Sequence, residues 1–337
     1  MIKYLGSKKK LLEQIVKLTP EGSVLDLFSG TSRVSNAFKK SGRLVIANDL
    51  SAYAKTLATA YCQVDQEDWL EDAQKLVAEF NSLTKPVDGY FTETFCRNSR
   101  FFQPENGAKI DGIREAIKAK GLDPELEAIA LTSLMEAADR VDSTTGVQMA
   151  YLKKWAERSF KPLELRVPEL TPAVSLGKCR AYSFEALDLV QKIENIDTAY
   201  LDPPYNQHSY LGNYHIWESL VLWDKPEVYG VACKRVDTRE KKSKLNSKVQ
   251  FTQHFTDIVN NLKVKKILVS FSNEGFINRE QMLEILSQRG PVIVHEFDYK
   301  RYVGAQIGIH NPDGQKVGTV SHTRNLEYIF EVDVHNP

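Results

Sequence analysis

The sequence predicts an α/β fold in which a sheet carries helices on both faces and a helical region is inserted after the second strand. Near the N-terminus a strand, a glycine turn, a helix and a second strand follow one another within about 28 residues. Helical spacing of apolar residues then dominates residues 51–161, and strand patterns return afterwards. The 337 residues are enough for one large domain or two modest ones.

The N-terminal elements form one βαβ unit. Residues 8–18 have the spacing of an amphipathic helix with Ser7 as its N-cap, and 23–28 form an apolar strand that runs into a tight turn. A helix over 34–40 and a second strand over 43–49 complete the unit. A unit of this kind implies parallel strands joined by a right-handed crossover.

The rest of the chain divides into an insertion and a return to the sheet. Apolar residues recur every three or four positions in four segments, which predicts helices over 69–83, 110–120, 125–141 and 147–158. Apolar runs predict strands over 198–204, 265–272, 291–302 and 325–332. We therefore expect one domain built from 1–62 and 170–337, interrupted by a helical recognition region over 63–169.

Composition excludes several classes of protein. No apolar run approaches the ~18 residues that a membrane span needs, which predicts a cytoplasmic protein with no membrane partner. The four cysteines lack CxxC or zinc spacing, so no metal is expected. Lys+Arg and Asp+Glu balance at 44 each, but residues 225–266 hold eleven basic against four acidic residues. Such a cluster is either a solvated face or a surface for phosphate.

The turn after the first strand has the character of a cofactor site. Gly30 follows the strand, where a missing side chain lets a ligand approach the backbone. Asp49 lies nineteen residues later, at the end of the second strand, where a carboxylate can accept hydrogen bonds from ribose hydroxyls. Dinucleotides and S-adenosylmethionine share this arrangement, but the dinucleotide pattern GxGxxG is absent. A simple tight turn remains the alternative.

The tetrapeptide Asp202-Pro203-Pro204-Tyr205 at the end of a predicted strand carries the most specific chemistry. Two prolines stiffen the turn and remove backbone donors, so nearby carbonyls act as acceptors. An aspartate and a proline carbonyl can together accept both hydrogens of an exocyclic amino group, which aims the nitrogen lone pair at an electrophilic methyl. The tyrosine ring can stack on a base flipped out of the duplex.

Together these segments resemble the Dam-like (α-group) DNA adenine-N6 methyltransferases, especially the branch of FokI-type modification methylases. The segments that carry the resemblance, in chain order, are YLGSK at 4–8, DLFSGT at 26–31, FFQPENGAKIDGIR at 101–114, EAADRV at 136–141, YLKKW at 151–155, DPPYNQHSYLGNYH at 202–215, SFSNEG at 270–275 and YKRY at 299–302. The resemblance implies a Rossmann-like, S-adenosylmethionine-dependent methyltransferase sheet with an inserted helical target-recognition region.

The resemblance also implies the site residues. Asp202, Pro203, Pro204 and Tyr205 would be catalytic. The cofactor would be bound by Tyr4, Gly6, Ser7, Lys8, Asp26, Phe28, Gly30, Thr31, Asp49 and Phe184, with Lys8 near its carboxylate, Asp49 on its ribose and Phe184 beside its adenine. The chain departs from the family pattern at Ser32, where a second glycine is usual, and at His208-Ser209, where Arg-Gln is frequent.

Double-stranded DNA is the expected partner. The base pocket or a mobile loop beside it would be formed by Asn206, Tyr210, Asn213, Tyr214 and His215. A structural role for His215 is favoured over general-base catalysis, because the proton can leave after methyl transfer. One cationic face on the insert would comprise Arg97, Arg100, Lys109 and Arg114, and a second Lys234, Arg235, Arg239, Lys241, Lys242 and Lys244.

The predicted reaction is direct methyl transfer from S-adenosylmethionine to the N6 amino group of adenine in DNA. Cytosine-N4 or RNA adenine methylation and a non-catalytic DNA-binding module are the alternatives. Cytosine ring-carbon methylation is disfavoured because the chain has no Pro-Cys nucleophile. The sequence leaves open whether a cognate restriction endonuclease exists.

Overall fold

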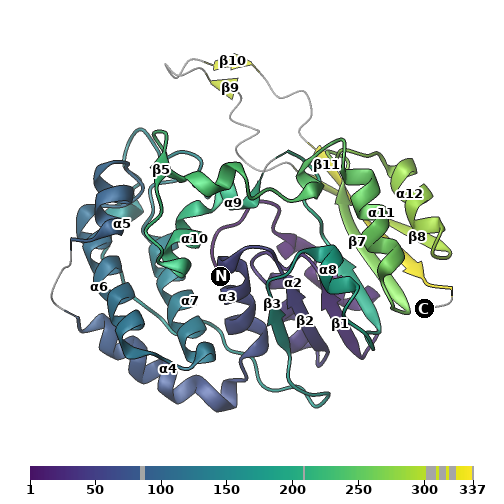
Figure 1. The fold of residues 1–337 in the computed structure, drawn as a ribbon, viewed down its shortest axis with the longest axis horizontal. Coiled ribbons are helices and arrows are strands. Elements are labelled where there is room, and N and C mark those ends of the chain that lie inside the picture. The colour runs from purple at the N-terminus through teal and green to yellow at the C-terminus, as the bar shows by residue number, and fades with distance from the viewer. Residues whose placement is uncertain (84–87, 208, 301–308, 311–315, 319–323, 336–337) are drawn as a thin grey trace.

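A seven-stranded sheet in the order β3-β2-β1-β4-β7-β11-β8 forms the centre of the molecule (Figure 1). The computed structural model describes residues 1–83, 88–207, 209–300, 309–310, 316–318 and 324–335. The sheet strands are β1 (Ser23–Asp26), β2 (Leu44–Asn48), β3 (Arg180–Tyr182), β4 (Thr198–Leu201), β7 (Lys266–Ser272), β8 (Val292–Lys300) and β11 (Arg324–Asp333). The five strands from β3 to β7 are parallel, and β11 runs antiparallel to β7 and β8.

Alternating residues of the central strands enter two apolar clusters, one on each face. Val24 of β1 packs with the helices α1 (Leu12–Leu18) and α2 (Arg33–Lys40). Its neighbour Leu25 packs with the helices α8 (Ala186–Val190), α11 (Phe251–Asn261) and α12 (Arg279–Ser287). On β4, Tyr200 and Leu201 divide in the same way. Successive side chains of a strand point to opposite faces of the sheet, so a strand that is apolar throughout needs helices on both faces of the sheet to cover its side chains. The predicted fold class is therefore confirmed.

Helices and four minor strands accompany the sheet. The helices are α1 (Leu12–Leu18), α2 (Arg33–Lys40), α3 (Ala52–Ala58), α4 (Gln66–Asn81), α5 (Tyr90–Thr92), α6 (Pro104–Lys120), α7 (Pro124–Arg140), α8 (Ala186–Val190), α9 (Tyr210–Asn213), α10 (His215–Leu222), α11 (Phe251–Asn261) and α12 (Arg279–Ser287). Two small hairpins pair β5 (Val228–Tyr229) with β6 (Lys234–Arg235) and β9 (Ile309–His310) with β10 (Lys316–Gly318). Within the described ranges, no helix has the length and apolar character needed to cross a membrane.

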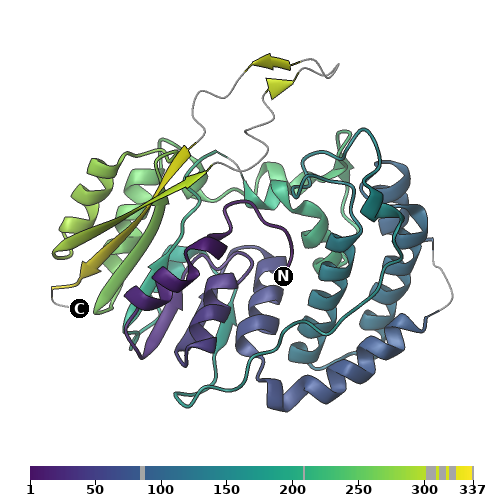
Figure 2. The same cartoon turned by 180° about the vertical axis from the view of Figure 1, so that it is seen from behind.

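The helices between β2 and β3 form a separate layer beside the sheet (Figures 1 and 2). Their apolar cluster includes α3 to α7 but also the N-terminal Ile2 and, from after β4, Trp217 and Leu220 of α10. Both the N-terminal segment and α10 thus connect this layer to the strands that carry the predicted site.

One predicted helix is wrong, and another is wrong in part. Residues 147–158 contain no α-helix, because their backbone groups bond to distant partners: Gln148 N–H donates to Asn213 O, and Leu152 N–H donates to Ser143 O. The predicted helix over 8–18 is divided into a 3₁₀ turn at Lys8–Lys10 and α1, and the Ser7 side chain does not cap it. His208 lies outside the described residues. The same holds for residues 301 and 302, which end the predicted strand over 291–302 and the segment at 299–302.

Candidate active site

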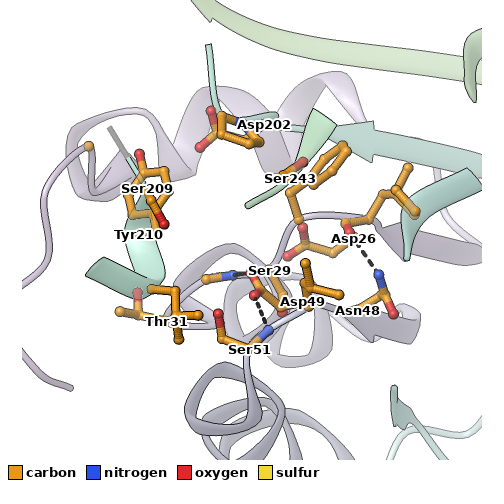
Figure 3. Close-up of a pocket in the computed structure, with 18 of the residues that line it drawn as sticks. Asp26, Ser29, Thr31, Asn48, Asp49, Ser51, Asp202, Ser209, Tyr210 and Ser243 are labelled. Carbon is orange, nitrogen blue, oxygen red and sulfur yellow. Dashed lines mark hydrogen bonds between the residues drawn. The ribbon is translucent and has the colours of Figure 1, made fainter. Parts of the chain in front are cut away.

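A cavity of about 490 Å³ opens at the carboxyl ends of β1, β2 and β4 (Figure 3). Open α/β sheets place ligands at this edge, where loops from neighbouring parallel strands converge. The ten residues predicted to bind the cofactor all line this cavity, from Tyr4 in the N-terminal segment to Phe184 before α8. The structure therefore brings together residues 180 positions apart.

The turn after β1 is shaped by Gly30 and Ser32, which both have a left-handed backbone conformation. Gly30 has φ of 51°, and a Cβ built there would lie 3.2 Å from the Tyr4 ring. Asp49 fixes this turn from the end of β2, because its Oδ2 accepts a hydrogen bond from Gly30 N–H at 3.0 Å and its Oδ1 accepts one from Ser51 N–H (Figure 3). Burial raises the pKa of the Asp49 carboxyl, and these backbone donors oppose the rise.

Asp26 places a nearly inaccessible carboxylate under the cavity. Its Oδ2 accepts a 2.6 Å hydrogen bond from Ser35 Oγ, while Oδ1 has no hydrogen-bond partner among the described residues. Burial raises the pKa of Asp26 to about 7, although the Ser35 hydroxyl favours the ionised form. A buried carboxylate with one unsatisfied oxygen is suited to a cationic ligand.

Asp202 faces the cavity from the end of β4 and pairs with a lysine from the N-terminal segment. Lys8 Nζ lies 3.1 Å from Asp202 Oδ1 and 3.6 Å from Glu327 Oε2 on β11. Burial raises the pKa of Asp202 to about 6 against the opposing effect of Lys8. Burial lowers the pKa of Lys8, but the two carboxylates more than reverse this and raise it above its ordinary value. The resemblance places Lys8 near the cofactor carboxylate, whereas here its ammonium pairs with carboxylates of the protein.

The aromatic residues around this pair form a stack. The ring of Tyr4 lies between Tyr210 and Tyr214, with centroid distances of 5.2 and 4.6 Å. Tyr210 and Pro204 line the cavity, but Tyr205 packs edge-on against Phe271 at 5.6 Å. The Asp-Pro-Pro-Tyr turn thus presents Asp202 and Pro204 to the cavity, whereas Pro203 is buried.

Two residues expected to form the base pocket have structural contacts instead. Tyr214 is buried, and its hydroxyl accepts a 2.6 Å hydrogen bond from Leu5 N–H. His215 is fully buried with Nε2 3.0 Å from Gln148 O, and burial lowers its pKa to about 3. A neutral, enclosed imidazole cannot exchange protons with a base in the cavity, which corrects its placement in the substrate site. Asn206 O accepts a hydrogen bond from Asn246, which lines the cavity, whereas Asn213 is buried and its carbonyl accepts one from Gln148 N–H.

The predicted cationic faces are smaller than the sequence suggested. Arg114 is buried, with its guanidinium bonded to the carbonyls of Leu220 and Val221. Arg235 is also buried and forms ion pairs with Asp224 and Asp237. Neither side chain is available to a duplex, because each is buried and bonded to other groups of the protein; both expectations are wrong.

The remaining cations divide between the insert and the cavity mouth. On the insert, Arg97 is exposed but paired with Asp88 and Glu93, Arg100 lies over Trp155, and Lys109 donates to Leu163 O. Near the cavity, Lys241 and Lys242 line its mouth, Arg239 lies over Tyr229, and Lys244 is exposed, as is part of Lys234.

Several residues of the cavity were missed from the sequence. Asn48 and Ser51 flank Asp49, and Glu218 of α10 accepts hydrogen bonds from Ala52 and Tyr53 N–H at the start of α3. Ser243 and Asn246 reach the cavity from the basic segment before α11. Their closeness in sequence to Asp49 could have indicated Asn48 and Ser51. The other three residues reach the cavity only because distant segments of the chain fold together.

This fold and cavity, with the Asp-Pro-Pro-Tyr turn at its edge, define a methyltransferase that acts on an amino nitrogen. The chain belongs to the D12 class of N6 adenine-specific DNA methyltransferases, whose family model matches residues 4–285. The resemblance inferred from the sequence is confirmed, and the family favours adenine in DNA over cytosine or RNA. Membership of this class also implies dependence on S-adenosylmethionine.

Individual relatives support the same assignment. The type II methyltransferase M.NlaIII of Neisseria lactamica is 32% identical over 315 residues, which cover 89% of this chain and 92% of the relative. M.FokI of Planomicrobium okeanokoites is 29% identical over 330 residues, and the modification methylase StsI of Streptococcus sanguinis is 30% identical over 333. These cover 89% and 91% of this chain but only half of each relative.

Proposed function

We propose that the cavity binds S-adenosylmethionine and that Asp202 orients the N6 amino group of a flipped adenine for direct methyl transfer. The observation that carries the proposal is the position of Asp202, which faces the same cavity as the glycine turn and Asp49. The carboxylates of Asp26 and Asp49 fit a cationic ligand, and the exposed Phe184 ring offers a surface for an adenine. The cofactor supplies an electrophilic methyl group when it is bound.

Each residue then has a defined task. Asp202 and a proline carbonyl of the turn accept the two amino hydrogens, which turns the nitrogen lone pair away from the ring. Lys8 keeps Asp202 ionised and fixed in position, so the carboxylate remains an acceptor. Tyr205 or Tyr210 supplies a ring face for the flipped base. The nitrogen loses its proton to solvent after the carbon–nitrogen bond has formed.

The DNA lies across the cavity mouth in this proposal. The insert over 63–169 reads the duplex, and Lys241, Lys242 and Lys244 contact its backbone beside the flipped base. The relatives named above are type II methyltransferases and modification methylases. We therefore assign this chain to modification in a restriction–modification system of a prokaryote or phage, with a cognate endonuclease as the expected partner and the cytoplasm as its place of action.

The test is mass spectrometry of nucleosides after incubation with deuterated-methyl S-adenosylmethionine and DNA, with RNA in parallel. Labelled N6-methyldeoxyadenosine is expected from wild type, and Asp202→Asn should lower the rate by at least about 100-fold because it removes the charged acceptor. A matched variant, Asp188→Asn on α8, should leave the rate unchanged. Label on cytosine or in RNA alone, or full activity of Asp202→Asn, would contradict the proposal.

A further inference from the structure

A second cavity, of about 360 Å³, lies on the outer side of the helical layer at the end of α7. Eight residues line this insert pocket: Ala137, Arg140, Val141, Arg158, Lys161, Pro162, Glu164 and Arg166. Four are cationic and one is acidic, so its lining carries a formal charge of +3. None of the four cations belongs to the faces predicted from the sequence, and the proposed transfer of a methyl group does not use them.

Two of the four cations lack a carboxylate partner. Glu164 Oε2 pairs with Arg166 at 3.3 Å, and Asp142 Oδ1 pairs with Arg158 at 2.7 Å. Within the described part of the chain, no carboxylate oxygen lies within 4 Å of Arg140 or Lys161. Arg140 donates to the Glu164 carbonyl at 2.6 Å, which holds its guanidinium at the pocket. Arg140 and Lys161 therefore bring positive charge to the pocket without a carboxylate in direct contact, although Glu136, Glu164 and Asp139 favour the charge of Arg140 from farther away.

A rigid framework positions this charge. Asn106 donates to the carbonyls of Ser159 and Lys161, and Lys109 donates to Leu163 O, so α6 supports the segment that carries Lys161. Lys109, predicted as a DNA contact, thus serves to hold this segment. A fixed group of cations is suited to a compact anion with several acceptor oxygens, as a phosphate is.

The insert pocket is connected to the active site through one carboxylate. Asp142 is buried and accepts from both Arg158 and Lys3, each at 2.7 Å. Lys3 directly precedes Tyr4, whose ring lines the first cavity.

We propose that the insert pocket binds a backbone phosphate of the DNA substrate. This inference rests on the proposed function, because it takes duplex DNA as the substrate. A phosphodiester is favoured over a free anion because the pocket lies on the helical layer that is proposed to contact DNA. The contact anchors the duplex without reading its sequence, since phosphate contacts position a protein and base contacts specify it.

The test measures duplex affinity by fluorescence anisotropy over a range of salt concentrations. The main variant is Lys161→Gln/Arg166→Gln, because both side chains are exposed and the Lys161 ammonium has no hydrogen bond or ion pair within the described residues. Its dissociation constant should rise roughly fivefold or more, equally for any duplex sequence, and the salt slope should fall by about 1. Arg140→Gln should act in the same direction. The matched control is Lys75→Gln/Lys263→Gln, which removes two exposed cations elsewhere.

The outcomes separate this inference from the proposed function. Equal affinity and salt slope in the main variant and the control would overturn the phosphate site, even if wild type methylates adenine. A reduced slope in the main variant, together with a wild type that produces no N6-methyladenine, would retain the phosphate site and overturn the proposed reaction. Stabilisation of wild type but not of the variant by inorganic phosphate, with an unchanged DNA slope, would identify a free-anion site and overturn the proposal. Thermal melting of every variant checks that it is folded.

Discussion

At the scale of single residues, the reactivity of the site depends on the electrostatic balance around Asp202. Burial favours the protonated carboxyl, Lys8 favours the carboxylate, and Glu327 opposes ionisation. A protonated Asp202 would lose its negative charge and half of its acceptor capacity. The pKa of about 6 therefore places the change between inactive and active forms just below neutral pH.

This balance predicts opposite pH shifts in two variants. Activity of wild type should rise through about pH 6 as Asp202 ionises. Lys8→Gln removes the favourable charge, so the rise should move to higher pH, by roughly one pH unit or more. Glu327→Gln removes a repulsive charge, so the rise should move to lower pH. Rates measured between pH 5 and 9 with saturating substrates check this prediction. An unshifted pH–rate profile in both variants would show that ionisation of Asp202 does not cause the rise in rate near pH 6.

The sequence indicated the residues of the cavity well because they adjoin strand ends. Asp49 and Asp202 each follow an apolar strand, so the parallel sheet brings them to one edge. Burial of long cationic side chains could not be predicted in the same way. Arg114 and Arg235 look like surface residues in the sequence. The end of α10 supplies the carbonyls that Arg114 bonds, and Asp224 and Asp237 pair with the buried Arg235.

At the scale of elements, the start of α2 shows why glycine is usual at position 32. Ser32 has φ of 56°, a left-handed conformation that costs an L-residue about 1–2 kcal/mol. Its hydroxyl is buried without a hydrogen-bond partner among the described residues. Ser32 does not line the first cavity, so the departure from the family pattern affects the backbone rather than the room for a cofactor.

Ser32→Gly should therefore stabilise the protein. Relief of the left-handed strain and of the unsatisfied hydroxyl outweighs the added entropy of an unfolded glycine, for a net gain of about 1 kcal/mol. Ser29→Gly is the matched control, because Ser29 also has a buried, unpartnered hydroxyl but no positive φ. Urea denaturation should rank Ser32→Gly above wild type and above the control. A destabilised Ser32→Gly would show that the side chain packs favourably enough to offset its strain.

Most elements were predictable from local periodicity, and the exception has a physical cause. The apolar spacing of residues 147–158 suits a helix, but Gln148 bonds to α10 through both its backbone and its side chain. Ser143 also accepts from Leu152 N–H and, through Oγ, from Ala156 N–H. Tertiary partners thus satisfy the groups that a helix would have paired, and local pattern cannot foresee them.

At the scale of the whole molecule, the site imposes a cost on folding that depends on pH. The pKa of Asp26 is about 7 in the folded protein, whereas an unfolded aspartate titrates near its ordinary value. Between these values the folded state retains a proton that the unfolded state has lost. Because of Asp26, the free energy of unfolding therefore falls as the pH rises from about 4 to 7 and does not change further above that range.

A cationic ligand should reverse this cost, which gives a prediction for cofactor binding. S-adenosylmethionine would favour the Asp26 carboxylate, so its affinity should rise with pH up to about 7 and then level off. The thermal shift that it produces should be larger at pH 8 than at pH 6. Asp26→Asn cannot ionise, so it should be more stable than wild type at pH 8 and show a thermal shift much less dependent on pH.

This experiment has a matched control, and the pKa of Asp26 sets the largest free-energy change that is expected. Asp197→Asn changes a carboxyl whose pKa is about 2, which stays ionised throughout the tested range and should leave the pH dependence intact. The linkage for Asp26 amounts to about 4 kcal/mol at most, from some three pH units at 1.36 kcal/mol each. An identical pH dependence in Asp26→Asn and wild type would mean that another group accepts the charge of the cofactor. If only Asp26→Asn loses the pH dependence of the thermal shift, the positive charge of the bound cofactor lies beside Asp26, at the carboxyl end of β1.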